Sequence, residues 1–156
     1  MRNWRRIWHD LKERCRLGTE GAAAVELAVV APALMLMVMG AWDFGRAFQE
    51  NARLESAARA GVQYGVFSTA NAQDLAGIVQ AARTDAGDQN NELTVTATQV
   101  CECPDGSPVD CSASCSGDAP RLYVNVLVEQ QFATLFPYPG ISSPITLSQQ
   151  AEMRAQ

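Results

Sequence analysis

Histidine is almost absent from this chain, and the position of the only one excludes a class of sites. His9 stands within the first twenty residues, ahead of a long apolar run. A histidine-based catalytic triad or metal centre therefore cannot be built from the rest of the chain. A nucleotide-binding glycine pattern is also missing, and Asp85, Asp88, Asp105 and Asp110 fall where we expect solvated loops. We expect a protein that is not an enzyme and has no cofactor and no metal.

Charge is nearly absent between residues 21 and 42, where Glu26 is the single exception. At about 1.5 Å per helical residue, Ala22 to Trp42 would reach roughly 31 Å, close to the hydrocarbon thickness of a bilayer. An acidic side chain at the bilayer centre costs roughly 2.5 to 3.5 kcal/mol, and less near an edge. Glu26 therefore indicates a partner within the membrane, or else a protonated side chain or one that reaches the headgroups.

Basic residues are concentrated ahead of this run. Residues 1–20 hold six Lys or Arg against three acids, and the remainder holds six against fourteen. Because positive flanks stay in the cytoplasm, we expect a cytoplasmic leader at 1–20, a transmembrane helix at 21–43 and an exported domain at 44–156. The acidity of the exported part disfavours nucleic acid as a partner. Its length allows one small domain.

Four of the five cysteines gather in the exported part, at Cys101, Cys103, Cys111 and Cys115. An even cluster in an exported, loop-rich stretch predicts two disulfides. The competing interpretation is a four-thiolate zinc site, but the spacing lacks the two C-x2-C knuckles of common zinc ribbons. Three pairings are open, of which the one with a direct Cys101–Cys103 bridge is the least favoured.

Proline is absent from residues 43–67, so the helix should continue beyond the membrane. Within the span, Pro32 predicts a kink or local melting. The outer part has a face of spaced apolar and small residues that we expect to be covered by the chain's own domain or by a neighbouring subunit. The residues expected at this packing face are Phe48, Ala57, Ala58 and Gly61.

The rest of the chain predicts a short amphipathic helix and three strands. After a break at 68–71, apolar residues at helical spacing indicate a helix over 72–87. Alternating residues indicate strands over 92–100, 121–132 and 145–154, while the prolines within 134–144 indicate a surface linker. The expected fold class is α+β, with a long N-terminal transmembrane helix packed on a small three-stranded antiparallel sheet.

An ordered set of short patterns runs from about residue 18 to residue 65. After a basic leader come GAAAVELAVVAPALMLMVMGAWDFGRAF, which starts at Gly21, and ENARLESAARAGVQYG. The set includes Val-Glu-Leu at 25–27, a Gly-Arg pair at 45–46 and Ala-Ala-Arg-Ala-Gly at 57–61. In this order the patterns resemble the TadE and TadG family of the tight-adherence (Flp) pilus machinery.

The resemblance implies a pilin-like pseudopilin or minor pilin in the bacterial inner membrane, crossing it once, with its C-terminal domain periplasmic or extracellular. The implied partners are other pilins, assembly platform proteins, the lipid bilayer and a prepilin peptidase that cuts between Gly21 and Ala22. Glu26 would then be the fifth mature residue and could pair with a neighbour's α-amino group; Glu26 and Pro32 are thus the expected intramembrane assembly residues. Leu27 stands where pilins of this machinery more often carry an aromatic, and TadG-like members keep the segment uncut, so both outcomes stay open.

Two other classes of protein are compatible with parts of the pattern. One is a secreted periplasmic protein with an unrelated binding role, whose apolar run is a signal sequence cut near Met39 or Gly40; the length of the run disfavours it. The other is a small membrane-tethered metal or redox protein that uses the cysteine cluster.

Overall fold

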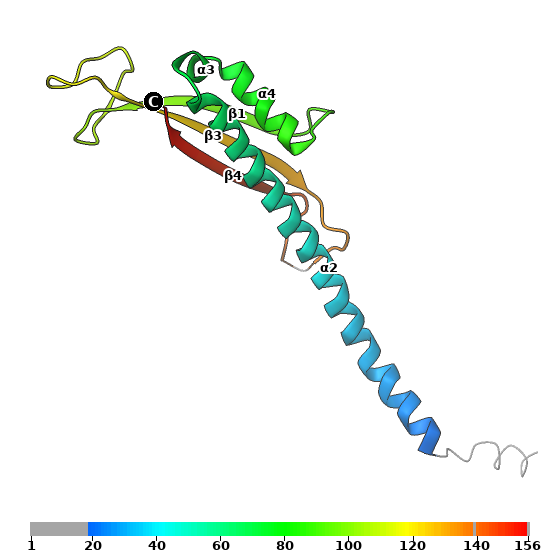
Figure 1. Ribbon diagram of the computed structural model, residues 1–156. Helices are drawn as coiled ribbons and strands as arrows, with labels where there is room; N and C mark the ends of the chain where they lie inside the picture. Colours follow the sequence, from blue (N-terminus) through cyan, green and yellow to red (C-terminus); the bar gives the residue numbers. More distant parts are fainter. Residues whose placement is uncertain (1–18, 139, 156) are drawn as a thin grey trace, which may run out of the picture. The chain divides into compact units, whose positions relative to one another are not determined.

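The computed structural model describes residues 19–138 and 140–155 (Figure 1). Its elements are α2 (Thr19–Val66), α3 (Thr69–Gln73), α4 (Leu75–Ala86), β1 (Thr94–Glu102), β2 (Pro108–Val109), β3 (Arg121–Phe132) and β4 (Ile145–Arg154). The predicted leader lies largely outside the described residues. The chain divides into two compact units, Met1–Trp42 and Asp43–Gln156, and we call the second unit the head. The expected α+β class, with a long apolar N-terminal helix and an antiparallel sheet, is confirmed.

Helix α2 is a single helix of 48 residues. In its outer half, Arg53 pairs with Glu50 at 3.0 Å and Arg59 pairs with Glu55. Such pairs three or four residues apart each support a helix by a few tenths of a kcal/mol. The helix also continues without interruption through Pro32. Of the two effects predicted for Pro32, local melting does not occur, because a missing N–H removes one bond while the neighbouring turns keep theirs, and the kink stays a prediction.

Two short helices follow α2 where we expected one helix after a break at 68–71. The hydroxyl of Ser68 accepts a hydrogen bond from the Asn71 N–H at 3.1 Å, and so caps α3. The Asp74 carboxylate accepts one from the Gly77 N–H at 2.9 Å, and so caps α4. A second N-cap so soon after the first ends one helix and starts the next. Helix α4 ends at Gly87, whose φ of 67° is the left-handed conformation that glycine adopts without strain.

The sheet is antiparallel, with the strand order β2-β1-β3-β4. Strands β3 and β4 have the predicted bounds, and β1 begins two residues later than predicted and ends two residues later. The sheet has four strands and not three, because the two-residue strand β2 pairs with Cys101 and Glu102. So short a strand carries no alternation that a sequence pattern could reveal.

One face of the sheet forms the core of the head. Val124, Val126 and Val128 of β3 are fully buried, as their alternation predicted. Helices α2 and α4 cover this face (Figure 1). The fully buried residues that the two helices contribute are Leu54, Ala57, Ala58, Val62, Ile78 and Ala82.

Two glycines allow α2 to lie close to the sheet and to α4. A Cβ atom on Gly61 would lie 3.3 Å from Val126 Cγ1 and 3.3 Å from Ala82 Cβ. A Cβ atom on Gly65 would lie 2.9 Å from Val124 Cγ1, which is closer than real atoms pack. Because the two glycines are four residues apart, they lie on the same helix face. The absence of a side chain at both positions allows this face to pack closely.

Candidate functional site

The apolar part of α2 exposes large hydrophobic side chains along its length. Val29 is 74% exposed and Leu36 is 70% exposed, and other large residues from Val25 to Trp42 are exposed in the same way. Within the described part of the chain, α2 is the one helix long and apolar enough to cross a membrane. An exposed apolar surface of this extent marks a membrane or protein contact.

The residues expected to act in the membrane all lie on this helix. Gly21 and Ala22 are in its first turns, and Glu26 and Pro32 are exposed on its surface. Among residues 19–138 and 140–155, no side chain forms an ion pair with Glu26. A partner for this carboxylate would therefore have to come from another molecule or from the part of the chain that is not described.

The residues of the predicted packing face, in the C-terminal half of α2, differ in whether the head covers them. Ala57, Ala58 and Gly61 are buried beneath the sheet. Phe48, in contrast, is 70% exposed, so the head does not cover it. At 100° per residue, Phe48 lies well away from the stripe that contains Leu54 and Ala58. The head therefore does not supply a cover for Phe48, and a cover from a neighbouring subunit stays a prediction.

Asp43 is the centre of a cluster that the sequence pattern did not predict. Its carboxylate accepts hydrogen bonds from the Leu135 N–H at 3.1 Å and from the Tyr138 hydroxyl at 3.1 Å. The Phe136 N–H donates to it as well. Arg46 Nη1 lies 3.2 Å from Asp43 Oδ1 and completes an ion pair one helical turn away. We call these five residues the Asp43 cluster.

The cluster keeps a nearly buried carboxylate ionised. Asp43 is only 4% exposed. Burial by itself would raise the pKa of Asp43, but the three hydrogen bonds and the positive charge of Arg46 favour the ionised form more strongly. The pKa of Asp43 therefore lies below its ordinary value. Burial and the hydrogen bond to Asp43 in turn raise the pKa of the Tyr138 hydroxyl.

The cluster ties the segment between β3 and β4 to helix α2. This segment, residues 133–144, was predicted to be a surface linker, and the described residues in it contain no strand. It is nevertheless held in place, since Asp43 binds Leu135 and Tyr138, and Arg46 lies over the Phe132 ring at 5.1 Å. The sequence offered one signal for this cluster: Asp43 directly follows the apolar run, and Arg46 lies three residues further on. This spacing predicts the ion pair, but it does not predict that Asp43 binds the loop between β3 and β4.

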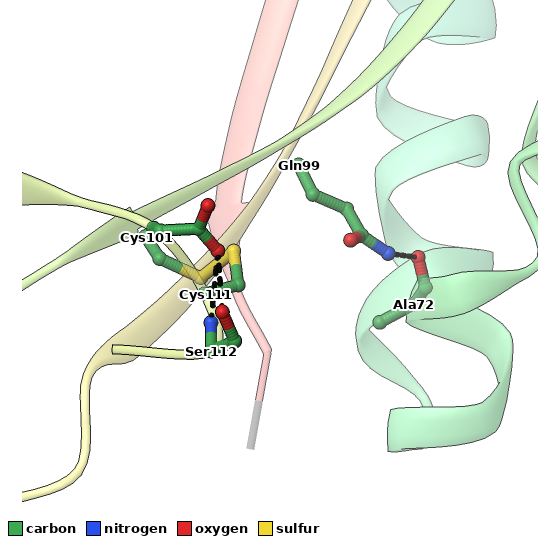
Figure 2. Close-up of a disulfide and its surroundings, with 6 residues drawn as sticks. Ala72, Gln99, Cys101, Cys111 and Ser112 are labelled. Atoms are coloured by element: carbon green, nitrogen blue, oxygen red, sulfur yellow. Dashed lines mark hydrogen bonds between the residues drawn. A yellow bond between two sulfur atoms is a disulfide. The ribbon is translucent and has the colours of Figure 1, made fainter. Parts of the chain in front are cut away.

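The four clustered cysteines form two disulfides, Cys101–Cys111 and Cys103–Cys115. The prediction of two disulfides is confirmed, and the least favoured pairing does not occur. Figure 2 shows the Cys101–Cys111 bridge and, beside it, Gln99, whose amide donates to the carbonyl of Ala72. The two bridges crosslink the segment from Cys101 to Cys115. The hydrogen bond from Gln99 to Ala72 links β1 to the C-terminal end of α3. No group of three or more potential metal ligands occurs among the described residues.

Comparison with known proteins finds a family match for the first part of this chain. Residues 21–63 match the family model described as TadE-like protein. The resemblance to the TadE-like family is confirmed over this segment. The TadE-like segment includes the apolar run, Asp43 and Arg46 of the Asp43 cluster, and the buried alanines of α2. The sheet and the disulfide loop lie outside it. No curated protein and no solved structure matches the chain.

Proposed function

We propose that this protein is a minor pilin or pseudopilin that takes part in the assembly of tight-adherence (Flp-type) pili, and that it acts by docking and not by catalysis. The observation that carries this function is the coincidence of the TadE-like segment, residues 21–63, with the exposed apolar helix. The segment contains a helix suited to lateral packing in lipid. A membrane-anchored pilus component fits both findings.

The proposed topology places one crossing at Gly21–Trp42 in the bacterial inner membrane. Residues 1–20 are cytoplasmic, and the head is periplasmic or extracellular. The excess of Lys and Arg before the span supports this orientation. The two disulfides support it too, since such bonds persist in oxidising compartments and are rare in the cytosol.

Within the membrane, Glu26 is the proposed contact with other pilins. Its side chain is exposed on the helix surface, and no ion-pair partner occurs in the described part of the chain. In a stack of staggered helices, the carboxylate can pair with the freed α-amino group of a neighbour, and each charge then compensates the other. The partners of this docking are other pilins and the proteins of the assembly platform.

Deletion and complementation test the function. Loss of the gene should abolish surface pili and adherence while the major pilin is still synthesised. Complementation with Glu26→Gln should fail to restore pili, whereas Glu55→Gln, which alters an exposed ion pair on the same helix outside the apolar run, should restore them. Unchanged pili in the deletion strain would contradict the function.

Processing of the leader is a separate proposal with its own measurement. If a prepilin peptidase cuts after Gly21, mass spectrometry of the membrane-extracted protein should find a chain that starts at Ala22. An intact Met1 terminus would contradict processing and leave an uncut anchor. A soluble periplasmic form that starts after residue 39 would instead support a secreted protein.

A further inference from the structure

The loop between β3 and β4 exposes a group of apolar side chains. Residues 133–144 read ATLFPYPGISSP and contain no charged residue, although the chain carries a net charge of −5. Leu135 is 56% exposed, Phe136 is 36% exposed and Ile141 is 54% exposed. The loop that joins β1 to β3 is different, since it contains Asp105, Asp110 and Asp118. These two loops thus present different chemistry to their surroundings.

The apolar loop is held in a defined place. Asp43 accepts the Leu135 N–H and the Tyr138 hydroxyl, and the Thr134 N–H donates to Ser143 Oγ at 3.2 Å across the base of the loop. The Ile141 N–H donates to the Tyr138 carbonyl at 3.2 Å and closes a turn. These N–H and hydroxyl groups are thus bonded within the head, while the side chains of Leu135, Phe136 and Ile141 stay exposed.

The residue that holds the loop directly follows the apolar run. Asp43 is covalently joined to Trp42, the last residue of that run, and Trp42 is itself 64% exposed. Figure 1 shows the loop, at residues 133–144, beside the part of α2 where the head begins. If Gly21–Trp42 lies in lipid, a loop bonded to the next residue lies at the boundary between hydrocarbon and water.

We propose that the β3–β4 loop is a membrane-binding surface, in which Leu135, Phe136 and Ile141 enter the interfacial layer of the bilayer. This inference rests on the proposed membrane anchor. Apolar and aromatic side chains with a tyrosine hydroxyl at their edge suit this layer, where one end of a group is apolar and the other is wet. The head would then contact the membrane twice, through its helix and through this loop, which limits its tilt about the helix.

Lipid is favoured over a protein partner by two features of the loop. A protein partner is usually recognised by anchors together with hydrogen bonds or charges at the rim. This loop has no charge, and the polar groups described above are bonded within the head. The loop is also bonded to Asp43, the residue that directly follows the apolar run in the sequence.

Site-specific fluorescence in vesicles tests the inference. The full chain, with Cys15→Ser to remove the thiol outside the disulfide loop, would carry one added cysteine labelled with the environment-sensitive dye NBD. The sites are Ile141→Cys in the loop, Leu34→Cys in the apolar run and Ala70→Cys on α3. Ala70 is exposed and follows the far end of α2, about 35 Å along the helix from Asp43. The vesicles contain phosphatidylethanolamine and phosphatidylglycerol, either without spin label or with a lipid spin-labelled near the headgroup, to report on Ile141, or midway along the acyl chain, to report on Leu34.

The expected result is a blue-shifted emission at Ile141 that loses most of its intensity with spin-labelled lipid, while emission at Ala70 is unchanged. Quenching at Leu34 with none at Ile141 would overturn the membrane-binding loop and leave the anchor intact. Absence of quenching at Leu34 would overturn the anchor and the loop together. A blue shift at Ile141 that depends on protein concentration, without quenching by lipid, would show that another protein covers the loop and would also overturn the inference.

Discussion

The carboxylate of Asp43 accepts the backbone N–H of Leu135, which lies 92 residues further along the chain, at 3.1 to 3.2 Å. This contact joins the residue after the apolar run to the loop between the last two strands. At Asp43 the helix therefore makes a tertiary contact with the head, in addition to its own helical hydrogen bonds. The consequences of this contact, of the close helix packing and of the disulfides can each be measured.

Replacing Asp43 should loosen the loop. In Asp43→Asn, the charge that holds Arg46 is lost, and an amide accepts fewer hydrogen bonds than a carboxylate. Amide exchange over residues 133–144 should become about tenfold faster, the factor expected from losing roughly one net hydrogen bond. Hydrogen exchange with mass spectrometry in detergent measures this change. Glu55→Gln on the same helix should leave exchange of the loop unaltered, and equal exchange in both variants would contradict the role of Asp43.

The Asp43 cluster should respond to acid at an unusually low pH. Because the pKa of Asp43 in the folded head lies below the ordinary 3.8, its contribution to stability is fully present above the unfolded pKa. That contribution is lost as the pH falls through the folded pKa. The chemical shift of the Leu135 amide, followed by NMR, should therefore titrate with a midpoint below 3.8. The transition should vanish in Asp43→Asn, and a midpoint above the ordinary value would contradict the ionised cluster.

A methyl group on Gly65 should destabilise the head. Its Cβ atom would lie 2.9 Å from Val124 Cγ1 and 3.0 Å from Ile78 Cδ1, and the β-branched valine has little freedom to move. We expect Gly65→Ala to lower the free energy of unfolding by about 1 to 3 kcal/mol, as overpacking typically does.

Gly45→Ala is the matched control for Gly65→Ala. It lies on the same helix and has nothing within 4 Å of the added atom. Since alanine is favoured over glycine inside a helix by roughly 0.5 to 1 kcal/mol, Gly45→Ala should be neutral or stabilising. Thermal unfolding of both variants in detergent, followed by circular dichroism, provides the comparison. Equal melting temperatures would contradict the close approach of α2 to the sheet.

Each disulfide should stabilise the head by constraining the unfolded chain. The paired cysteines are 10 and 12 residues apart. Loops of this size correspond to about 2 to 3 kcal/mol of loop-closure entropy each. Because the loops interleave, the double removal should cost less than the sum. Urea unfolding of Cys101→Ser/Cys111→Ser and of Cys103→Ser/Cys115→Ser measures the loss, and peptide mapping without reductant should find these two linkages and neither alternative.

Local patterns were sufficient for much of the fold. The bounds of β3 and β4 and the buried side of β3 followed from alternation, because side chains of a strand point to opposite faces in turn. The apolar run followed from composition alone. The split into α3 and α4 was missed because two capping residues, Ser68 and Asp74, compete within six residues. Phe48 was grouped with the alanines but the head leaves it exposed, because apolar character says nothing about which side of the helix the sheet will cover.

The contact between Asp43 and Leu135 could not be predicted from the sequence, because it joins residues that are distant along the chain. Periodicity, capping and hydrophobic length are properties of neighbours along the chain, and they revealed the long apolar helix, the strands and the presence of crosslinks. Which cysteines pair, how closely Gly65 approaches Val124 and what Asp43 binds are properties of neighbours in space. They arise only when burial of the valines of β3 against α2 brings distant segments together, because the hydrophobic effect is not directional and leaves the choice of polar partners to the folded geometry.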